Sequence, residues 1–317
     1  GDIGGTHARL ALAELGTSPP VRERRYFCAD YADFEPLLTD YVRTENQPIE
    51  AGCLAVAGPI SDDGTRAKLT NLPWTIDVAT LASRLGLGRL SLANDFTAAA
   101  LGVTACPAGT LVTLQAGAPL ADAPRLVVGA GTGLGMAVLL PASDGWQVLP
   151  GEGGHVGFGP IDPEQVELWR HLFQKHGRVT AERALSGPGL ESIFRYVSPE
   201  APAASAEAIS RLAAENPACP AGHAVRLFLS AYGAFAGDMA MTVLARGGVY
   251  LAGGIAAKLL PLLPTSPFLS TFNAKAEHAD LVERMPVAVV TDTSLGLRGA
   301  AVLAGLTLAN NCNKLDT

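Results

Sequence analysis

Two neighbouring polar residues, Asn94 and Asp95, stand where an apolar strand pattern gives way to a helix pattern. Residues 90–93 are predicted to end a buried strand, and the alanine-rich residues from Thr97 onward indicate a helix. Side chains at such junctions of α/β proteins face ligand clefts, where an Asp can accept a proton from a hydroxyl that an adjacent Asn holds. The same residue types also cap helix N-termini, so this stretch alone fits either a catalytic or a capping role.

Two glycine-rich turns have the composition of phosphate-binding loops. Residues 1–6 are Gly-Asp-Ile-Gly-Gly-Thr and lead into an apolar alternation, and residues 129–135 are Gly-Ala-Gly-Thr-Gly-Leu-Gly and precede an apolar run. Each pattern predicts strand, turn and strand, so the P-loop and the dinucleotide fingerprint, which require a helix after the glycines, are absent from the sequence. Backbone amides without side chains can approach phosphate oxygens closely, although a plain tight hairpin also explains either turn taken singly.

Asp2 stands at the head of the first turn. A carboxylate beside phosphates requires a cation between them, and we expect Mg²⁺ bound through waters; an Asx turn within a hairpin is the alternative. When Gly129 is aligned on Gly1, Gly133 falls on Gly5, an offset of 128 residues. This repeated hairpin predicts two related domains that face each other across a ligand.

A third group of polar residues, Glu152, His155 and Glu182, suits a polyhydroxylated ligand. Glu152 and His155 lie in the loop 150–160, where neighbouring glycines disfavour a helix and the loop can present both side chains as hydrogen-bonding groups. Glu182 is expected in the first turn of a short helix, where the helix dipole favours an acid whatever its function. Each residue taken alone therefore has an ordinary structural explanation.

Composition excludes several classes of protein. The 317 residues are 48% hydrophobic and 17% charged, which is typical of a globular chain long enough for two domains. A net charge of −7 and an isoelectric point near 5.4 argue against a nucleic-acid partner and predict that backbone amides and metal hold anionic ligands. The interrupted apolar runs predict no membrane span. Five dispersed cysteines argue against a zinc ribbon and predict reduced thiols in a cytosol; they are Cys28, Cys53, Cys106, Cys219 and Cys312.

Strand and helix patterns alternate after each glycine hairpin, which predicts an α/β fold. Residues 164–176 predict an amphipathic helix with Val166, Trp169, Leu172 and Phe173 on one apolar face. We expect a short extended segment at 69–74, and a short helix at 180–185 that Gly187-Pro188-Gly189 stops. Gly1 is expected in the tail of a strand, with a few residues upstream of it. The other expected helices are 34–44, 78–85, 206–215, 224–244 and 299–306, and the other strands are 52–56, 125–128, 248–252 and 287–290.

Taken together and in order, these segments resemble the bacterial ATP-dependent glucokinases that lack a zinc motif, within the sugar-kinase/actin/heat-shock ATPase superfamily. The resemblance runs nearly end to end, and the ordered set is far more specific than any one glycine turn. Beside the two turns, it rests on 92–98 (Leu-Ala-Asn-Asp-Phe-Thr-Ala), 149–156 (Leu-Pro-Gly-Glu-Gly-Gly-His-Val), 181–190 (Ala-Glu-Arg-Ala-Leu-Ser-Gly-Pro-Gly-Leu) and 251–255 (Leu-Ala-Gly-Gly-Ile).

The resemblance implies a role for each candidate residue. Asp95 matches the catalytic base and also a sugar-binding residue, and the other positions that match contacts to glucose hydroxyls are Asn94, Glu152, His155 and Glu182. The positions that match the nucleotide site are Gly1, Asp2, Ile3, Gly4, Gly5 and Thr6 in the first phosphate loop, with Asp2 near magnesium, then Gly131, Thr132 and Gly133 in the second phosphate loop, and Gly253 and Gly254 on the adenosine side.

The same resemblance implies the fold and the partners. It implies two ribonuclease-H-like α/β domains with an interdomain cleft, a small one of residues 1–105 plus 296–317 and a large one of 106–295. A cytoplasmic homodimer without nucleic-acid or membrane partners is expected. Structural zinc is not expected, because the sequence lacks the cysteine cluster of zinc-containing relatives. His7 stands where the family often has Asn, and Gly157 replaces a position that is often polar; both are expected to tune affinity.

The reaction that the resemblance implies is transfer of the γ-phosphoryl group of ATP to the 6-hydroxyl of glucose. Glucose 6-phosphate and ADP would form, as in the first step of glycolysis, with Asp95 accepting the hydroxyl proton. A kinase for another hexose, a non-catalytic sugar sensor or transcriptional regulator of the same fold, and an actin-like or chaperone ATPase are the alternatives. A regulator normally carries a basic helix-turn-helix, for which this sequence leaves no room, and an ATPase has no need of three sugar-type side chains.

Overall fold

The computed structural model describes residues 1–14, 20–143 and 145–315, of which 309–315 by their backbone alone. It divides into two compact units: unit 1 is Gly1–Pro107 with Asp292–Thr317, and unit 2 is Ala108–Thr291. Within the described ranges, helices that combine the length and the apolarity needed to cross a bilayer are absent. The side chain of Cys312 lies outside the described residues, and Cys28, Cys53 and Cys219 are free thiols.

Unit 1 is built on a five-stranded sheet in the order β3-β2-β1-β4-β7. β1 pairs with β2 in the antiparallel direction, which confirms the predicted hairpin, and with β4 in the parallel direction. β4 and β7 are also parallel, so the carboxyl ends of three strands meet at one edge of the sheet. The strands are β1 (Asp2–Ile3), β2 (His7–Leu12), β3 (Val21–Phe27), β4 (Ala51–Val56) and β7 (Arg89–Asn94).

A separate hairpin of β5 (Arg66–Lys68) and β6 (Thr75–Asp77) corrects the extended segment expected at 69–74. Those residues form the bend between the two strands, which the backbone amide of Leu69 closes by donating to the carbonyl of Trp74 (3.1 Å). Both side chains are buried. The extended prediction was wrong because the apolar residues that anchor this bend in the core have the composition of a strand.

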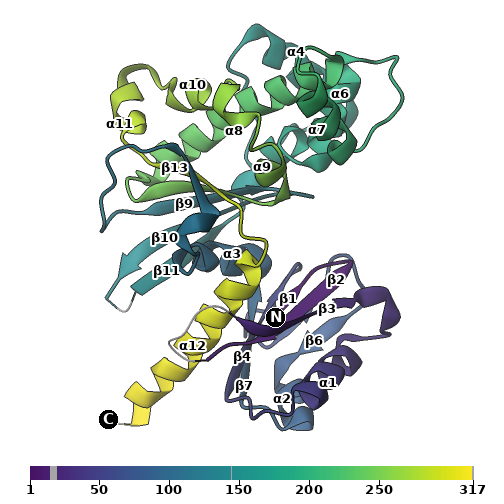
Figure 1. Cartoon of the computed structure of the whole chain (residues 1–317), viewed down its shortest axis with the longest axis vertical. Coiled ribbons are helices and arrows are strands. Elements are labelled where there is room, and N and C mark those ends of the chain that lie inside the picture. Colours follow the sequence, from purple (N-terminus) through teal and green to yellow (C-terminus); the bar gives the residue numbers. More distant parts are fainter. Residues whose placement is uncertain (15–19, 144, 316–317) are drawn as a thin grey trace. The chain divides into compact units, whose positions relative to one another are not determined.

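Helices cover both faces of the unit 1 sheet (Figure 1). Alternate residues of β4 face opposite sides, so Leu54 and Val56 pack with α1 (Phe34–Glu45) and α2 (Val78–Leu85). Cys53 and Ala55 face the other side, where α3 (Asp95–Thr104) and α12 (Leu295–Leu315) pack through small side chains. A 3-10 turn, η1 (Cys28–Asp30), follows β3. α12 begins four residues before the helix expected at 299–306 and continues beyond it.

Unit 2 repeats this topology in a six-stranded sheet of order β11-β10-β9-β12-β13-β8. The order β3-β2-β1-β4-β7 of unit 1 corresponds strand by strand to the order β11-β10-β9-β12-β13 of unit 2. In each sheet, antiparallel hairpins along the chain are followed by strands that pair in the parallel direction. The repeated glycine hairpin is thus part of a repeated sheet. The strands are β8 (Leu111–Gln115), β9 (Arg125–Ala130), β10 (Leu134–Ala142), β11 (Gly145–Gly151), β12 (Gly248–Ala252) and β13 (Val287–Val290).

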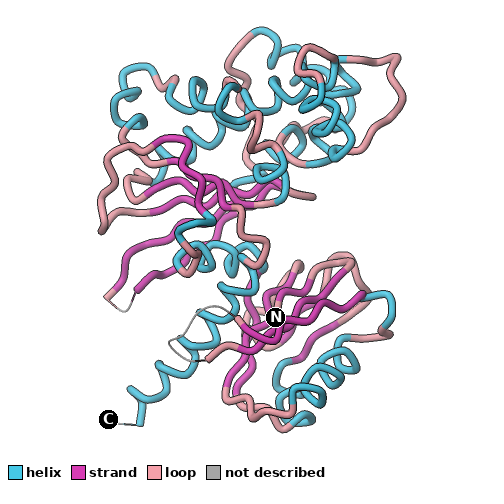
Figure 2. The backbone as a smooth tube through the Cα atoms, in the orientation of Figure 1, coloured by secondary structure: helices cyan, strands magenta, loops and turns pink. Residues whose placement is uncertain are grey.

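Most helices of unit 2 gather on one side of its sheet (Figure 2). The long helix α8 packs Phe228 and Tyr232 into the core there, and the Tyr232 hydroxyl donates to the carbonyl of Val128 on β9 (3.3 Å). The helices are α4 (Pro163–His176), α5 (Ala181–Ala184), α6 (Gly187–Val197), α7 (Ala206–Glu215), α8 (Pro220–Val243), α9 (Gly254–Lys258), α10 (Phe268–Asn273) and α11 (Ala279–Glu283), with 3-10 turns η2 (Ala108–Thr110), η3 (Gly153–His155), η4 (Leu263–Thr265) and η5 (Ala276–His278).

Two helix predictions in unit 2 need correction. On α4 the residues facing the core are Gln165, Leu168 and Leu172, whereas Val166 and Phe173 are exposed. The expected apolar face was wrong because a buried glutamine, which donates to Ser230 Oγ (3.1 Å), takes one core position.

Gly187-Pro188-Gly189 begins helix α6 instead of only ending the helix before it. The hydroxyl of Ser186 accepts a hydrogen bond from the amide of Gly189 (3.1 Å), and Pro188 lies in the first turn, where a proline costs no hydrogen bond. The prediction treated these three residues only as the end of the preceding helix, because glycine and proline also stop helices.

We predict that Gly299→Ala lowers the free energy of unfolding by about 1–3 kcal/mol, despite the better helix propensity of alanine. In the native structure a Cβ at Gly299 would come within 1.6 Å of the carbonyl oxygen of Ala98, so α3 and α12 must separate. Urea unfolding followed by circular dichroism measures the effect. Gly109→Ala is the control, because its Cβ would meet no atom within 4 Å; equal midpoints for the two variants would contradict the close helix contact.

Candidate functional site

Asn94 and Asp95 lie at the carboxyl edge of the unit 1 sheet, where β7 passes directly into α3. Oδ1 of Asn94 accepts hydrogen bonds from the backbone amides of Phe96 (2.9 Å) and Thr97 (3.2 Å). Oδ1 of Asp95 also accepts from the amide of Phe96 (2.8 Å). The capping role that the sequence left open is confirmed for Asn94, and it is compatible with a ligand contact because the cap uses the oxygen of the side chain and not its nitrogen.

The first glycine turn leaves the sheet from the same edge. Ile3 at the end of β1 pairs with Val56, and Val56 pairs with Asn94 at the end of β7, so the three strand ends form one row. The turn is closed by the amide of Gly4, which donates to the carbonyl of His7 (3.0 Å). Unit 1 therefore brings Asp95 and the predicted phosphate loop to one edge.

Asp2 is half-buried and faces the first turn of α12. Burial raises the pKa of its carboxyl above the ordinary value, and the Arg9 guanidinium acts in the opposite direction to a smaller extent. A Cβ on Gly296 would lie 3.0 Å from Oδ2 of Asp2, so the carboxylate lies directly against the helix backbone. An ionised carboxylate that has lost part of its hydration gains from a cation, and oxygen is the ligand that Mg²⁺ prefers, so Asp2 fits a magnesium site.

Arg9 holds the start of α12 near Asp2. Its Nε donates to Glu23 on β3 (2.8 Å), and its Nη2 donates to the hydroxyl of Ser294 (2.8 Å). Its Nη1 donates to the carbonyl of Thr293. Because Arg9 also pairs with Asp2 in the register of the hairpin, this network places the first turn of α12 beside that carboxylate.

The second glycine turn, Gly131 to Gly133, joins β9 to β10 as the predicted hairpin. The amide of Gly131 donates to the carbonyl of Gly133 (2.8 Å), and the carbonyl of Gly131 accepts from the amide of Gly187 (2.8 Å). The exposed Thr132 lies between them. Ala252 at the end of β12 pairs with Gly129 of β9, so Gly253 and Gly254 follow at the same edge of the sheet. Unit 2 therefore brings its two predicted nucleotide segments together.

Glu182 lies against this second turn. Its Oε2 accepts a hydrogen bond from the backbone amide of Leu134 (2.9 Å), the residue that follows the turn. A Cβ on Gly133 would lie 2.6 Å from the same oxygen, so a larger residue at position 133 would have to displace the end of the Glu182 side chain. The hairpin backbone thus fixes Glu182, in addition to any effect of its place in the first turn of α5.

Glu152 directly precedes the 3-10 turn η3 that follows β11, and His155 is the last residue of that turn. Their side chains are 87% and 59% exposed, and Nε2 of His155 lies 3.8 Å from Oε2 of Glu152. The amide of Ala181 donates to the carbonyl of Val156 (2.9 Å), which connects this loop to the residue before Glu182. Unit 2 therefore presents the three predicted sugar-contacting residues from two backbone segments that are bonded to each other.

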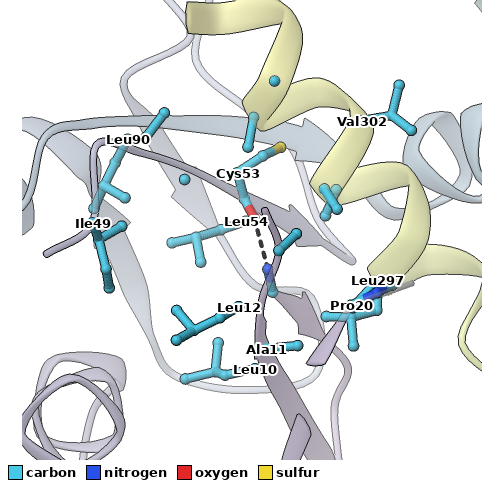
Figure 3. A pocket seen from close by; sticks show the side chains of 18 of the residues that line it. Leu10, Ala11, Leu12, Pro20, Ile49, Cys53, Leu54, Leu90, Leu297 and Val302 are labelled. Atoms are coloured by element: carbon cyan, nitrogen blue, oxygen red, sulfur yellow. Dashed lines mark hydrogen bonds between the residues drawn. The ribbon is translucent and has the colours of Figure 1, made fainter. Parts of the chain in front are cut away.

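A cavity of about 670 Å³ lies elsewhere in unit 1 (Figure 3). Its lining is mainly apolar and includes Leu10 of β2, Leu54 of β4 and Val302 of α12. Gly1 is the one candidate residue in this lining, and its amino group donates to the carbonyl of Cys53 (2.7 Å). A mainly apolar wall leaves most sugar hydroxyls or phosphate oxygens without hydrogen-bond partners, so this cavity does not suit either ligand.

Gly296 and Arg9, which shape the unit 1 site, escaped the sequence analysis, and Leu134 lay within the predicted 129–135 turn without a role of its own. Leu134 and Gly296 contribute only backbone, which leaves no trace in the side-chain pattern. Arg9 is a charged residue between Ala8 and Leu10 in an apolar alternation. That interruption is the signal that could have identified it.

The whole chain is similar to known glucokinases. A family model described as Glucokinase matches residues 1–307. The chain is 37% identical to a glucokinase of Nostoc sp., with 96% of this chain and 97% of that protein covered. Among solved structures, it is similar to glucokinase from an Antarctic psychrotroph (TM-score 0.87, 29% identity, 96% of this chain and 97% of that one). It is also similar to glucokinase from Balamuthia mandrillaris in complex with glucose (TM-score 0.78, 26% identity, 96% and 92%).

We predict that Asn94→Ala lowers the free energy of unfolding by about 1 kcal/mol and that Asn94→Ser restores most of the loss, because serine also caps helices. The comparison separates the cap from any ligand contact of the amide group. Thermal and urea unfolding of the two variants measure the effect. If both variants lose the same stability, the bonds to Phe96 and Thr97 are not what stabilises the start of α3.

Proposed function

Because the chain belongs to the glucokinase family, which phosphorylates glucose with ATP, we propose that Asp95 is the general base of the transfer. The observation that carries this proposal is the row of strand ends that brings Asp95 and the first glycine turn to one edge of unit 1. A carboxylate beside a phosphate-binding turn can accept the proton of the 6-hydroxyl of glucose and direct its oxygen toward the γ-phosphoryl group.

We propose that Asn94, Glu152, His155 and Glu182 bind the other hydroxyls of the sugar. The high exposure of Glu152 and His155 supports this role, because polar side chains held out by a bonded backbone can exchange water for sugar hydroxyls at little cost. Several acceptors on one sugar also give specificity. An analogue that lacks a hydroxyl leaves one of these polar groups unpaired.

The nucleotide would bind through backbone amides of the two glycine turns, at residues 1–6 and 131–133, with Gly253 and Gly254 beside the adenosine. Their places at the carboxyl edges of the two sheets support this assignment. Asp2 would hold Mg²⁺ through water. When bound, that ion supplies positive charge that offsets the negative charge of the phosphates during transfer.

The finer assignments belong to the same proposal: two ribonuclease-H-like domains, residues 1–105 with 296–317 and residues 106–295, with an interdomain cleft, in a cytoplasmic homodimer without structural zinc. The shared strand order of the two units supports the paired domains. The free thiols of Cys28, Cys53 and Cys219 are consistent with a reducing compartment. Light scattering after size exclusion at several protein concentrations tests the homodimer.

We predict that Asp95→Asn lowers kcat for glucose phosphorylation by about 10²–10⁴-fold, the usual contribution of a general base, with a much smaller change in the dissociation constant of glucose. Asparagine can still accept the hydrogen bond from Phe96, so the start of α3 is preserved. ADP release, measured with and without glucose and over a panel of other hexoses, gives the rates and the sugar preference.

Asp280→Asn is the matched control, because Asp280 is an exposed acid in the first turn of another helix, α11. We expect its turnover to equal that of the unmodified chain. Full activity in Asp95→Asn would refute the base assignment, and ADP release that ignores every sugar would refute the kinase assignment as a whole.

A further inference from the structure

The carboxylate of Glu182 touches the proposed phosphate turn itself. Its Oε2 accepts the hydrogen bond of the Leu134 amide (2.9 Å), and Gly133 within the turn leaves the space that this oxygen occupies. The carboxylate of Glu152, in contrast, belongs to a side chain that is 87% exposed. Glu182 therefore places a negative charge beside the second glycine turn, whose backbone amides would bind a phosphate group of the nucleotide.

The backbone holds this carboxylate where it is. α5, which carries Glu182, is followed by Gly187, whose amide donates to the carbonyl of Gly131 in the turn (2.8 Å). On the other side, the amide of Ala181 is bonded to Val156 in the loop of His155 (2.9 Å). The turn, Glu182 and the loop of His155 thus form one continuous hydrogen-bonded assembly within unit 2.

We propose that Glu182 couples the binding of the two substrates, an inference that rests on the proposed function of this site. In the absence of sugar the charge of Glu182 repels a phosphate at the second glycine turn. Sugar hydroxyls that donate to the carboxylate spread and partly offset this charge, so glucose strengthens nucleotide binding. By thermodynamic linkage the nucleotide strengthens glucose binding by the same factor.

This coupling gives Glu182 a function beyond contact with the sugar. If ATP binds weakly until glucose is present, ATP seldom occupies the sugar-free site. In that site water is the available acceptor of the γ-phosphoryl group. Glu182 would then protect ATP from hydrolysis through equilibrium binding. No conformational change is required for this effect, since the charge and the turn are already in contact.

The test is calorimetric titration of the full chain with Mg²⁺ and the non-hydrolysable ATP analogue AMPPNP, with and without saturating glucose. In the unmodified chain we expect glucose to lower the dissociation constant of AMPPNP by about 5-fold or more, the lower end of typical coupling between sites. In Glu182→Gln we expect AMPPNP to bind more tightly than in the unmodified chain when glucose is absent, because glutamine keeps the acceptor for Leu134 and removes the charge.

Glu191→Gln is the matched control. Glu191 lies on α6, and its carboxylate also accepts a backbone amide, that of Ala206 (3.1 Å), so the control removes the same charge outside the site. We expect its sugar-free dissociation constant for AMPPNP to equal that of the unmodified chain. A purely structural role of Glu182 would weaken nucleotide binding in Glu182→Gln or leave it unchanged, and either result would overturn the proposal.

The outcomes also separate this inference from the function on which it rests. If Glu182→Gln weakens glucose binding but leaves sugar-free AMPPNP binding unchanged, the coupling is wrong and the sugar contact stands. If glucose binding is unchanged as well, the assignment of Glu182 to the sugar fails. Should the variant not fold, the unmodified chain still decides, because an AMPPNP dissociation constant that is the same with and without glucose excludes coupling.

Discussion

The hydrogen bond from the Leu134 amide to the Glu182 carboxylate is the contact on which the unit 2 site depends. It joins a strand and a helix whose bonded residues are 48 positions apart, and the carboxylate lies where a side chain at position 133 would begin. The loop of His155 is bonded in turn to the residue before Glu182. One close approach of backbone to an acid therefore connects the second glycine turn with the two segments that carry the proposed sugar contacts.

Unit 1 has the same arrangement of an acid against a glycine backbone. Asp2 rests against Gly296 as Glu182 rests against Gly133, and in each case an added Cβ would come within about 3 Å of a carboxylate oxygen. Arg9 fixes the helix start that carries Gly296, just as the bond between Gly131 and Gly187 fixes the turn in unit 2. In both units a carboxylate therefore lies directly against the backbone of a glycine, and for Glu182 a hydrogen bond from the Leu134 amide holds it there.

Local chemistry explains why part of this was predictable from the sequence. Asn94 before an alanine-rich run has the pattern of a cap, and a glycine run between apolar alternations has the pattern of a hairpin, because each structure is determined by adjacent residues. The contacts of Asp2 with Gly296 and of Glu182 with Leu134 depend on how distant segments pack, and a glycine that makes room for a distant acid is the same residue as a glycine that only turns the chain.

The errors follow from the same distinction. The segment from Leu69 to Trp74 is a bend whose two end residues are buried by packing against other parts of the fold. Composition alone could not distinguish this bend from a strand. On α4, the buried Gln165 depends on Ser230 of another helix, a pairing that a helical wheel does not contain. Periodicity identifies an element and its approximate ends, and tertiary hydrogen bonds decide which residues it buries.

The placement of acids beside both glycine turns is consistent with a chain of net charge −7 that binds a highly charged anion. Basic side chains at the turns would favour nucleotide binding under all conditions. With carboxylates at both turns, nucleotide binding depends on ligands that offset the two negative charges. In the proposed function these ligands are the magnesium ion beside Asp2 and the sugar beside Glu182. Nucleotide affinity would then be greatest when the metal and the sugar are both present, the state in which phosphoryl transfer to the sugar can occur.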